Sequence, residues 1–419
     1  MRGSRSISCR SSTTWTSRKT SPGCARRWRR RPVPRRRRGR RSPASTEAPV
    51  ADHHIVLVGG GHTHVQVLTA FRDRPEPGAR LTLVTDRRLT PYSGMLPGHI
   101  AGHYRREAMH IDLEALARRC GAGFRLAAAT GIDRDGRAVR LADGGSLAFD
   151  TLSLDVGITP DLTGIDGADR HALAVKPIGG LLDQLDARLA GEGKPNRILM
   201  VGGGPAGIEI ALALRTRLAA REPRPWIGIA AGEALAPGLN AGMRRRIRAA
   251  LARRGVTVLE PCRIASVDAD GATASDGRRI AAELVIVSTA ARAPNWLAST
   301  GLRRAEDGSV LTADTLATLS DPAIFAVGDC AAIDGQRREK AGVFAVRQGP
   351  PLVENLRRRV RGAALRPYRA QTRYLAILST GDGGAVAGRG RWLALEGRWV
   401  WLWKDWLDRS FMGRFDASD

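Results

Sequence analysis

The chain has 419 residues, 43% of them hydrophobic, which is enough for two or three globular domains. Its formal net charge is +26, but residues 1–50 alone contribute +15, through fifteen Arg, one Lys and one Glu. The five Cys residues are scattered without a CxxC pair, and no run of about 18 apolar residues occurs. We therefore expect neither a disulfide framework, nor a structural zinc site, nor a membrane-spanning helix.

Residues 1–50 are predicted to be a disordered basic tail, because they are rich in Arg, Ser, Thr and Pro and show no hydrophobic period. A transit peptide and a start codon placed upstream of the true first residue are alternative interpretations, although Pro32, Pro34 and the arginines of 35–38 would interrupt an amphipathic helix. Basic runs are usually solvated tails, so we expect no specific nucleic-acid partner. The unpaired cysteines fit a reducing, cytoplasmic location.

The first ordered segment predicts a strand, a glycine turn, a helix and a second strand. Ile55–Val58 is an apolar strand that runs directly into Gly59-Gly60-Gly61. Val65–Phe71 has the apolar period of a helix, and Leu81–Val84 is the next strand. In this context Gly59 and Gly61 would let the backbone approach a pyrophosphate at the helix N-terminus.

The residues that follow this loop only partly match a dinucleotide-binding motif. His64 stands where the third glycine of GxGxxG is expected. An acidic residue should close the second strand and bind the ribose hydroxyls, and the candidates here are Thr85 and Asp86.

The same pattern returns further along the chain, so the sequence holds an internal repeat. Arg197–Val201 predicts a strand and Ile208–Leu218 a helix. Between them the GxGxxG motif is complete, and it consists of Gly202, Gly204, Pro205, Ala206 and Gly207, with Glu209 following. Glu233, near the end of the next predicted strand, and the lack of Arg between residues 226 and 242 favour NADH over NADPH.

A predicted hairpin and a returning strand follow each repeat. Arg137–Leu141 and Ser146–Leu154 flank an Asp-Gly-Gly turn. Ala272–Ser275 and Ile280–Val287 flank an Asp-Gly turn in the same way.

The C-terminal 50 residues contain five of the nine tryptophans: Trp392, Trp399, Trp401, Trp403 and Trp406. At helical spacing Trp399, Trp403 and Trp406 share one face, whereas Trp401 does not. Peripheral docking at a membrane surface, contact in a homodimer and packing on the first nucleotide domain are the alternatives for this region.

A third motif resembles a known family. Phe325–Ala331 is similar to the late FAD motif of the pyridine nucleotide-disulfide oxidoreductase superfamily, in which the Gly-Asp pair, here Gly328 and Asp329, contacts FAD. The resemblance implies an α/β protein with two Rossmann-like, three-layer (β/β/α) dinucleotide-binding domains, the NAD domain being inserted in a discontinuous FAD domain. The expected parts are a tail (1–50), the FAD domain (51–165 and 301–365), the NAD(P)H domain (166–300) and a small Trp-rich C-terminal region (366–419).

Two features narrow the resemblance within the superfamily. No Cys lies between Cys24 and Cys120, so the redox disulfide of the disulfide reductases is excluded. Leu89–Gly98 looks like the flavin-facing segment of type II NADH dehydrogenases. Together with Gly59–His64, and with segments 340–350 and 397–405, it resembles the oxidoreductase module found fused to selenide, water dikinases. Further cofactor-binding residues implied by the resemblance are His62, His64, Pro91, Ser93, Gly94 and Gly157.

The sequence departs from the superfamily at the turn after each hairpin. Where Ala-Thr-Gly is usual, the first turn is Asp155-Val156-Gly157 and the second is Ser288-Thr289-Ala290.

The expected function is an FAD-dependent NAD(P)H oxidoreductase that passes hydride from nicotinamide to flavin and then to a quinone-like or other acceptor. The candidate catalytic residues are Glu209, placed near the nicotinamide by resemblance, and Lys340, which could reach the flavin or an acidic partner. A helix-terminal acid and a solvated surface lysine are the structural alternatives. A reductase linked to selenium metabolism and a nucleotide-sensing flavoprotein without turnover are the competing functions.

Two histidine pairs have metal-type spacing, His62 with His64 and His99 with His103. Neither pair has the third and fourth ligands that a site needs nearby, so no metal is expected.

Overall fold

The first glycine loop belongs to a five-stranded parallel sheet. The computed structural model describes residues 52–191, 193–289, 291–336 and 338–415, so the predicted tail lies outside the described residues. The strand order is β21-β9-β1-β2-β5. These strands are β1 (His53–Val58), β2 (Ala79–Thr85), β5 (Gly123–Leu126), β9 (Thr151–Leu154) and β21 (Ile324–Ala326).

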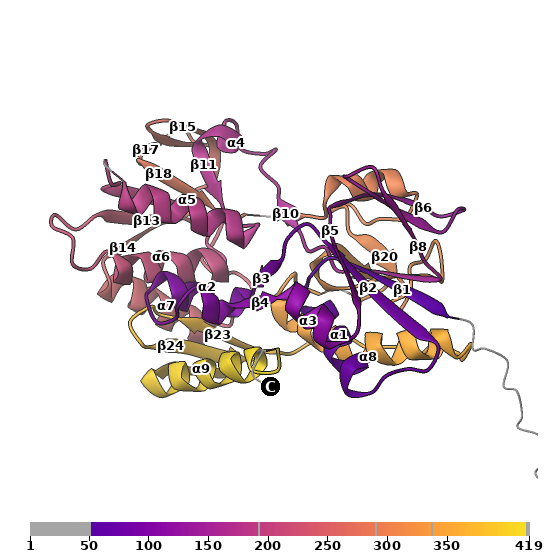
Figure 1. Cartoon of the computed structure of the whole chain (residues 1–419). Coiled ribbons are helices and arrows are strands. Elements are labelled where there is room, and N and C mark those ends of the chain that lie inside the picture. Colours follow the sequence, from indigo (N-terminus) through magenta and orange to yellow (C-terminus); the bar gives the residue numbers. More distant parts are fainter. Residues whose placement is uncertain (1–51, 192, 290, 337, 416–419) are drawn as a thin grey trace, which may run out of the picture. The chain divides into compact units, whose positions relative to one another are not determined.

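Strand β1 is buried on both faces, which explains its unbroken apolar sequence. Ile55 and Leu57 pack toward helices, whereas Val56 and Val58 pack toward a second, three-stranded sheet. The helices are α1 (His62–Asp73), α3 (Leu113–Arg119) and α8 (Gly342–Val360), and the small sheet holds β6 (Ala129–Asp133), β7 (Ala138–Leu141) and β8 (Ser146–Ala148). The predicted β/β/α layering is confirmed (Figure 1).

The second unit repeats this architecture. Ile198 and Met200 of its central strand face helices, and Leu199 and Val201 face a small antiparallel sheet. The parallel order is β11-β18-β12-β13-β14, with β11 (Ala172–Ala174), β12 (Arg197–Val201), β13 (Trp226–Ala230), β14 (Val256–Leu259) and β18 (Leu284–Val287). Its helices are α4 (Ala168–His171), α5 (Ile178–Ala190), α6 (Pro205–Arg217) and α7 (Ala241–Arg253), and its small sheet holds β15 (Ile264–Asp268), β16 (Gly271–Ala274) and β17 (Arg279–Ala281).

The second unit is inserted into the first, as the resemblance implied. The chain leaves the first sheet after β9 and returns to it only at β21, which pairs with β9. The two crossings lie together, since β10 (Thr159–Pro160) pairs with β19 (Ala291–Arg292). The returning part also holds β20 (Val310–Thr312), β22 (Ala331–Ile333), and the 3-10 helices η3 (Asn295–Thr300) and η4 (Gly328–Cys330). The domain boundaries themselves stay predictions.

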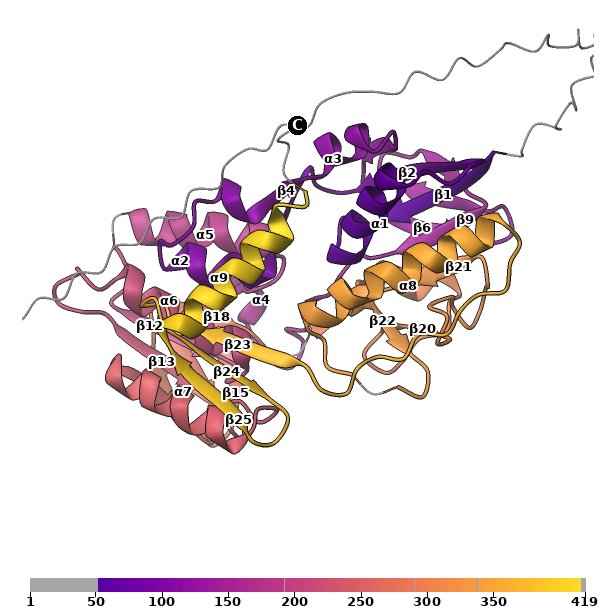
Figure 2. The same cartoon turned by 90° about the horizontal axis from the view of Figure 1, so that it is seen from below.

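The C-terminal region is a three-stranded antiparallel sheet covered by a helix. The sheet consists of β23 (Leu375–Ser379), β24 (Ala385–Arg389) and β25 (Leu393–Gly397), and the helix is α9 (Arg398–Met412). Val400 and Trp401 of α9 pack on the sheet, which in turn lies against α6 and α7 of the second unit (Figure 2).

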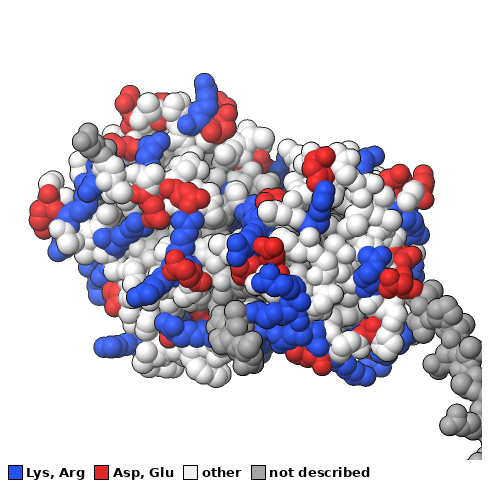
Figure 3. Space-filling model, viewed as in Figure 1, with Lys and Arg blue, Asp and Glu red and all other residues white. Residues whose placement is uncertain are grey.

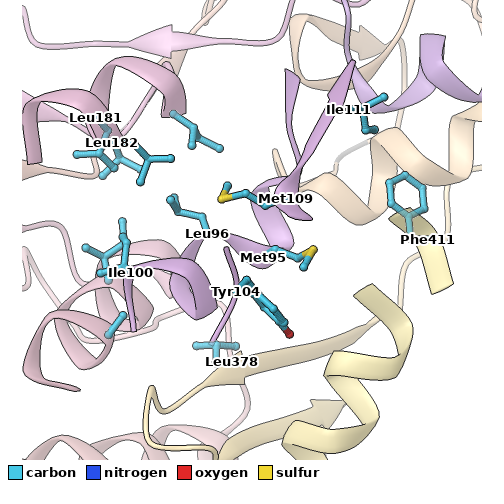
Figure 4. Packing of buried hydrophobic residues seen from close by; sticks show 14 of the residues in the cluster. Met95, Leu96, Ile100, Tyr104, Met109, Ile111, Leu181, Leu182, Leu378 and Phe411 are labelled. Atoms are coloured by element: carbon cyan, nitrogen blue, oxygen red, sulfur yellow. The ribbon is translucent and has the colours of Figure 1, made fainter. Parts of the chain in front are cut away.

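The segment after β2 joins the three parts. It contains β3 (Leu89–Pro91), η1 (Ser93–Met95), α2 (Leu96–Ile100), η2 (Glu107–Met109) and β4 (His110–Asp112). Figure 4 shows Leu96 on the side of Leu181 and Leu182 of α5, and Met95 beside Tyr104, with Leu378 of β23 nearby.

Two predicted strands are wrong in extent. Ser146–Leu154 splits into β8 and β9, which belong to different sheets, and Ile280–Val287 splits into β17 and β18. At the first split, Asp150 accepts a hydrogen bond from the amide of His54 at 2.7 Å, and its own amide donates to the carbonyl oxygen of His54. This pairing fixes the start of β9 beside β1, so the chain changes layer there.

Candidate functional site

The first glycine loop opens onto a cleft of about 380 Å³ at the carboxyl end of the first sheet. Gly59 has a φ of +97°, and a Cβ there would overlap the carbonyl oxygen of Asp155, so only glycine fits. Gly61 caps α1, whose first amides have no intrahelical acceptor. The cleft is lined by residues expected to hold a dinucleotide: Gly59, Gly61, Thr85, Asp86, Pro91 and Gly157.

His64 replaces the third glycine by filling space between α1 and the sheet. Its Nδ1 lies 2.8 Å from the carbonyl oxygen of Gly59, and its Nε2 lies 2.8 Å from Oγ of Ser153 in β9. Burial lowers the pKa of His64 to about 4, so the ring is neutral at pH 7. In the second loop a Cβ on Gly207 would overlap the carbonyl oxygen of Gly202, so no such side chain fits. His64 is therefore a structural member of the loop.

Thr85 and Asp86 stand at the end of β2, where a ribose is expected. The Thr85 hydroxyl donates to the carbonyl oxygen of Arg87 at 3.2 Å. Both carboxylate oxygens of Asp86 accept from the Arg87 guanidinium, at 3.0 and 2.8 Å. These hydrogen bonds lower the pKa of Asp86, which keeps it an acceptor for hydroxyl groups.

The closing motif after β21 meets this loop from the other side. Gly328 has a φ of +67°, and a Cβ there would overlap the Asp155 carboxyl group. Asp329 Oδ2 lies 2.9 Å from Nζ of Lys176. Asp329 Oδ1 is buried and has no hydrogen-bond partner among the described residues. A buried carboxylate oxygen without a donor fits a cofactor hydroxyl or amide.

Lys340 and Cys330 lie behind this motif. Lys340 donates to Ser309 Oγ at 2.5 Å, and to the carbonyl oxygens of Asp329 at 2.8 Å and Ala331 at 3.1 Å. These bonds use all three ammonium protons, and Asp307 Oδ2 lies 3.4 Å from the same nitrogen, so the geometry favours a structural role. The expected catalytic role of Lys340 stays a prediction. Burial raises the pKa of Cys330 to about 12, so this thiol packs and does not react.

The second loop has the geometry of a complete dinucleotide motif. Gly202 has a φ of +118°, and a Cβ there would overlap the carbonyl oxygen of Ser288. Gly204 caps α6, and Pro205 and Ala206 form the first helical positions, where proline is well tolerated. The close approach of Gly207 to Gly202 brings helix and strand together.

Beyond β13, the acidic residue expected to favour NADH has a basic neighbour. The Glu233 side chain is 93% exposed, and Oε1 lies 4.0 Å from the Arg263 guanidinium. Arg263 lies outside residues 226–242, in the segment between β14 and β15, and only the fold brings it beside Glu233. An acid and a cation side by side leave the choice between NADH and NADPH open.

Glu209 is half-buried where the second unit meets the C-terminal sheet. Its Oε1 accepts from the amide of Ser379 in β23 at 2.8 Å. Burial raises the pKa of Glu209 to about 7, against the opposing charge of Lys404. It stands beyond the first turn of α6, so helix-dipole stabilisation does not explain its place.

Lys404 of α9 ties the C-terminal helix to the segment after β2, and sequence reasoning missed it as a site residue. Its Nζ donates to the carbonyl oxygen of Gly94 at 2.6 Å and to Oδ2 of Asp408 at 2.6 Å. Burial raises the pKa of Asp408 and that of Tyr92, whose side chain faces Asp408. Of the predicted pair, Gly94 thus contacts α9, while Ser93 lies close to Gly342 at the start of α8. The scarcity of Lys in this chain was the one available signal for Lys404.

His62 opens α1 in an aromatic environment. Its ring centroid lies 5.3 Å from that of Tyr92 and 6.1 Å from that of Phe411 in α9. Burial lowers the pKa of His62 to about 4, and its Nε2 has no partner among the described residues.

The second histidine pair serves the backbone. His99 Nδ1 lies 2.9 Å from the carbonyl oxygen of Tyr104, and His103 Nε2 lies 2.8 Å from that of Gly381. Within the described ranges, no three His, Cys, Asp or Glu side chains gather as metal ligands do, and no helix is long and apolar enough to cross a bilayer.

Comparison with known proteins gives one family match and several relatives. The family model described as pyridine nucleotide-disulphide oxidoreductase matches residues 53–354. A probable ferredoxin reductase of Castellaniella defragrans is 26% identical over 295 residues, covering 67% of this chain and 68% of that protein. An NADH dehydrogenase-like protein of Mycobacterium tuberculosis is 29% identical over 272 residues, covering 58% and 64%. The solved sulfide:quinone oxidoreductase of Aquifex aeolicus has a TM-score of 0.72 at 18% identity, covering 87% and 91%.

The buried place of His64 predicts that restoring the usual glycine is harmful. His64→Gly removes two hydrogen bonds to buried groups and leaves a cavity, so the free energy of unfolding should fall by about 2–4 kcal/mol in urea unfolding. Thr69→Ala on the same helix is the control, and should change it by less than about 0.5 kcal/mol. A His64→Gly protein as stable as wild type would contradict this account.

Proposed function

The chain belongs to the pyridine nucleotide-disulphide oxidoreductase family, and from this premise we propose that it oxidises NADH or NADPH through FAD and delivers the electrons to a quinone. Proteins of this family bind FAD and a nicotinamide dinucleotide. The observation that carries the proposal is the pair of equivalent glycine loops, each at the carboxyl edge of its own parallel sheet.

FAD fits the first unit because three features converge on one cleft. The loop at Gly59 and Gly61 admits a pyrophosphate, the ionised Asp86 can accept from the ribose, and the unpartnered Oδ1 of Asp329 needs a donor. Bound there, FAD would accept a hydride and release electrons singly or in pairs. The protein's part is to hold the two dinucleotides in line.

The nicotinamide dinucleotide fits the second unit. Gly204 leaves the α6 N-terminus open, so the amides of Ala206 and Gly207 can bind a pyrophosphate. The segment of β3 and η1 then lies between the two units, as expected of residues that face the flavin.

A redox disulfide has no place in the proposed route. Sequence alone excludes a cysteine pair in the flavin-facing segment, because none lies between Cys24 and Cys120. The three cysteines in the described ranges are free, and those at 262 and 330 are buried in different units. Electrons would therefore leave directly from the flavin.

Glu209 is the group proposed to supply protons on the acceptor side, with Lys404 as a fixed cation nearby. Reduction of a quinone to a quinol consumes two protons. With its pKa raised to about 7, Glu209 holds a proton for part of the time at neutral pH. Lys404 places a cation on Gly94 of the flavin-facing segment.

A quinone is favoured as acceptor by the outer surface of α9, which we call the Trp face. It consists of Trp399 (54% exposed), Leu402 (52%), Trp403 (36%) and Trp406 (63%). The sequence prediction that Trp401 leaves this face is confirmed, since Trp401 packs on the sheet and against His103. Exposed tryptophans on an amphipathic helix suit a membrane interface, where quinones dissolve.

The competing functions differ in what supports them. A protein acceptor is suggested by the relative named a ferredoxin reductase. Figure 3 shows acidic and basic side chains on one face of the molecule, with basic side chains gathered below its centre. The selenium-linked function rests on the sequence resemblance alone and stays a prediction. The alternative of a flavoprotein without turnover is supported by the departures from the family pattern at His64, Val156 and Ala290. Of these, His64 has a structural reason and Val156 lines the cleft. Ala290 lies outside the described residues.

The proposal predicts a yellow protein that loses its flavin colour when NADH or NADPH is added without oxygen. Absorbance near the flavin maximum should fall with each nucleotide and recover on addition of a soluble quinone. Parallel titrations with the two nucleotides will decide the preference that Glu233 and Arg263 leave open. A flavin that neither nucleotide reduces would refute the proposed function.

Glu209→Gln should separate the two half-reactions. Reduction of flavin by NADH should stay within about threefold, whereas quinone reduction should slow about a hundredfold, as expected on removing a proton donor. Because the pKa of Glu209 is about 7, the wild-type quinone rate should decline above that pH, and the variant should lose this dependence. Glu222→Gln, an exposed acid of the same unit, is the control for stopped-flow kinetics. Equal losses in both half-reactions would show that Glu209 acts on nicotinamide binding.

The Trp face predicts binding to lipid vesicles. Replacing Trp399, Trp403 and Trp406 together by Ser should reduce co-sedimentation with anionic vesicles at least tenfold, while leaving reduction of a water-soluble quinone intact. Leu126→Ser, an exposed apolar residue at the end of β5, should leave both properties unchanged. If the wild type does not bind vesicles, and is a dimer where the triple variant is a monomer, the Trp face is a subunit contact.

A further inference from the structure

The two nucleotide units differ at one residue beside the glycine loop. In each unit, one strand runs beside the central strand and ends next to the glycine loop. The amide of the residue that follows this strand donates a hydrogen bond to the carbonyl oxygen of the last residue of the central strand. Asp155 donates to the carbonyl oxygen of Val58 at 2.8 Å, and Ser288 donates to that of Val201 at 2.8 Å. Asp155 and Ser288 therefore occupy equivalent positions, and their carbonyl oxygens exclude a side chain at Gly59 and Gly202 in the same way.

The carboxyl group of Asp155 enters its loop and occupies two amides of the helix N-terminus. Its Oδ2 accepts from the amides of Thr63 at 2.9 Å and His64 at 3.2 Å. A Cβ built on Gly61 would overlap this carboxyl group. In the second unit, a Cβ built on Gly204 meets nothing within 4 Å. The N-terminus of α6 is therefore open, whereas two amides at the N-terminus of α1 are already bonded to the Asp155 carboxyl group.

An ionised Asp155 would oppose the ligand that this loop is built to hold. The N-terminus of α1 is where a pyrophosphate is expected, and a buried carboxylate beside it adds a like charge. A neutral acid keeps both bonds from the α1 amides and gains a proton to donate to a phosphate oxygen.

The surroundings of Asp155 favour the neutral form. Burial raises its pKa to about 7 and the charge of Asp329 adds to this, while the amides of His64 and Thr63 oppose it. Two cations lie beside Asp155 and Asp329, and one of them, Arg338, donates to the carbonyl oxygen of Gly328. Lys176 is bound to Asp329.

We propose that Asp155 is a positioning residue for the FAD pyrophosphate that becomes neutral when the dinucleotide binds, so that FAD binding takes up one proton from solution. This inference rests on the proposed function, because it requires FAD in the first unit. The buried neighbours His64 and Cys330 do not exchange protons between pH 6 and 9, because their pKa values are about 4 and 12. They therefore cannot account for proton uptake in this range.

The test is FAD binding to the flavin-free full chain between pH 6 and 9, by calorimetry in two buffers of different ionisation enthalpy. Wild type should show no proton uptake at pH 6 and nearly one proton per FAD at pH 8.5. Its affinity should weaken toward tenfold per pH unit above about pH 7. Asp155→Asn, which keeps an acceptor and a donor without a charge, should bind FAD with constant affinity over this range. Asp86→Asn, which changes the other acid of the cleft, should weaken binding equally at every pH and keep the wild-type slope.

The outcomes separate the two proposals. If no FAD binds at any pH, the proposed function fails. If FAD binds without proton uptake, or Asp155→Asn keeps the wild-type slope, Asp155 is already neutral or stays charged, and the inference is overturned while the function stands. The wild-type proton count decides the matter even if the variant does not fold.

Discussion

The close contact between each glycine loop and the strand beside it is the constraint on which the rest of the structure depends. The carbonyl oxygens of Asp155 and Ser288 lie where side chains would begin at Gly59 and Gly202. This contact sets the turn, the turn aims α1 and α6, and the helix N-termini then face the carboxyl edges of their sheets. Because both units obey it, the chain can hold two dinucleotides in one orientation relative to their strands.

The repeated contact also explains what the sequence could predict. Strand, glycine turn and helix are local features, so both units were visible from residue order, and the family motif at Gly328 and Asp329 implied the inserted arrangement that β21 confirms. The ends of the strands could not be predicted where the chain passes from one sheet to another without a glycine or proline, as at Asp150.

Side-chain partners distant in sequence could not be predicted. From sequence, His64 only weakens the glycine motif, because the loop gives no sign of its hydrogen-bond partner Ser153, which lies 89 residues away. Lys340 was assigned to catalysis because its three acceptors, among them Ser309, are fixed only by the fold. Lys404 was missed for the converse reason: its partners at Gly94 and Asp408 make sense only once α9 is seen beside the flavin-facing segment.

The placement of Lys404 bears on the Trp face. Burying the Lys404–Asp408 pair costs solvation free energy, which is recovered only through its mutual bond and the bond to Gly94. That geometry fixes the rotation of α9, and with it the four side chains of the Trp face and Leu407 are left outward. On this part of α9 the usual distribution is reversed, because charged side chains are buried and tryptophans are exposed to water. Under the proposed function, a lipid interface would remove this conflict by covering the outer face, and it would bring a dissolved quinone to the helix that also contacts Gly94. The same rotation thus serves both the cation near the flavin and the surface from which its acceptor would come.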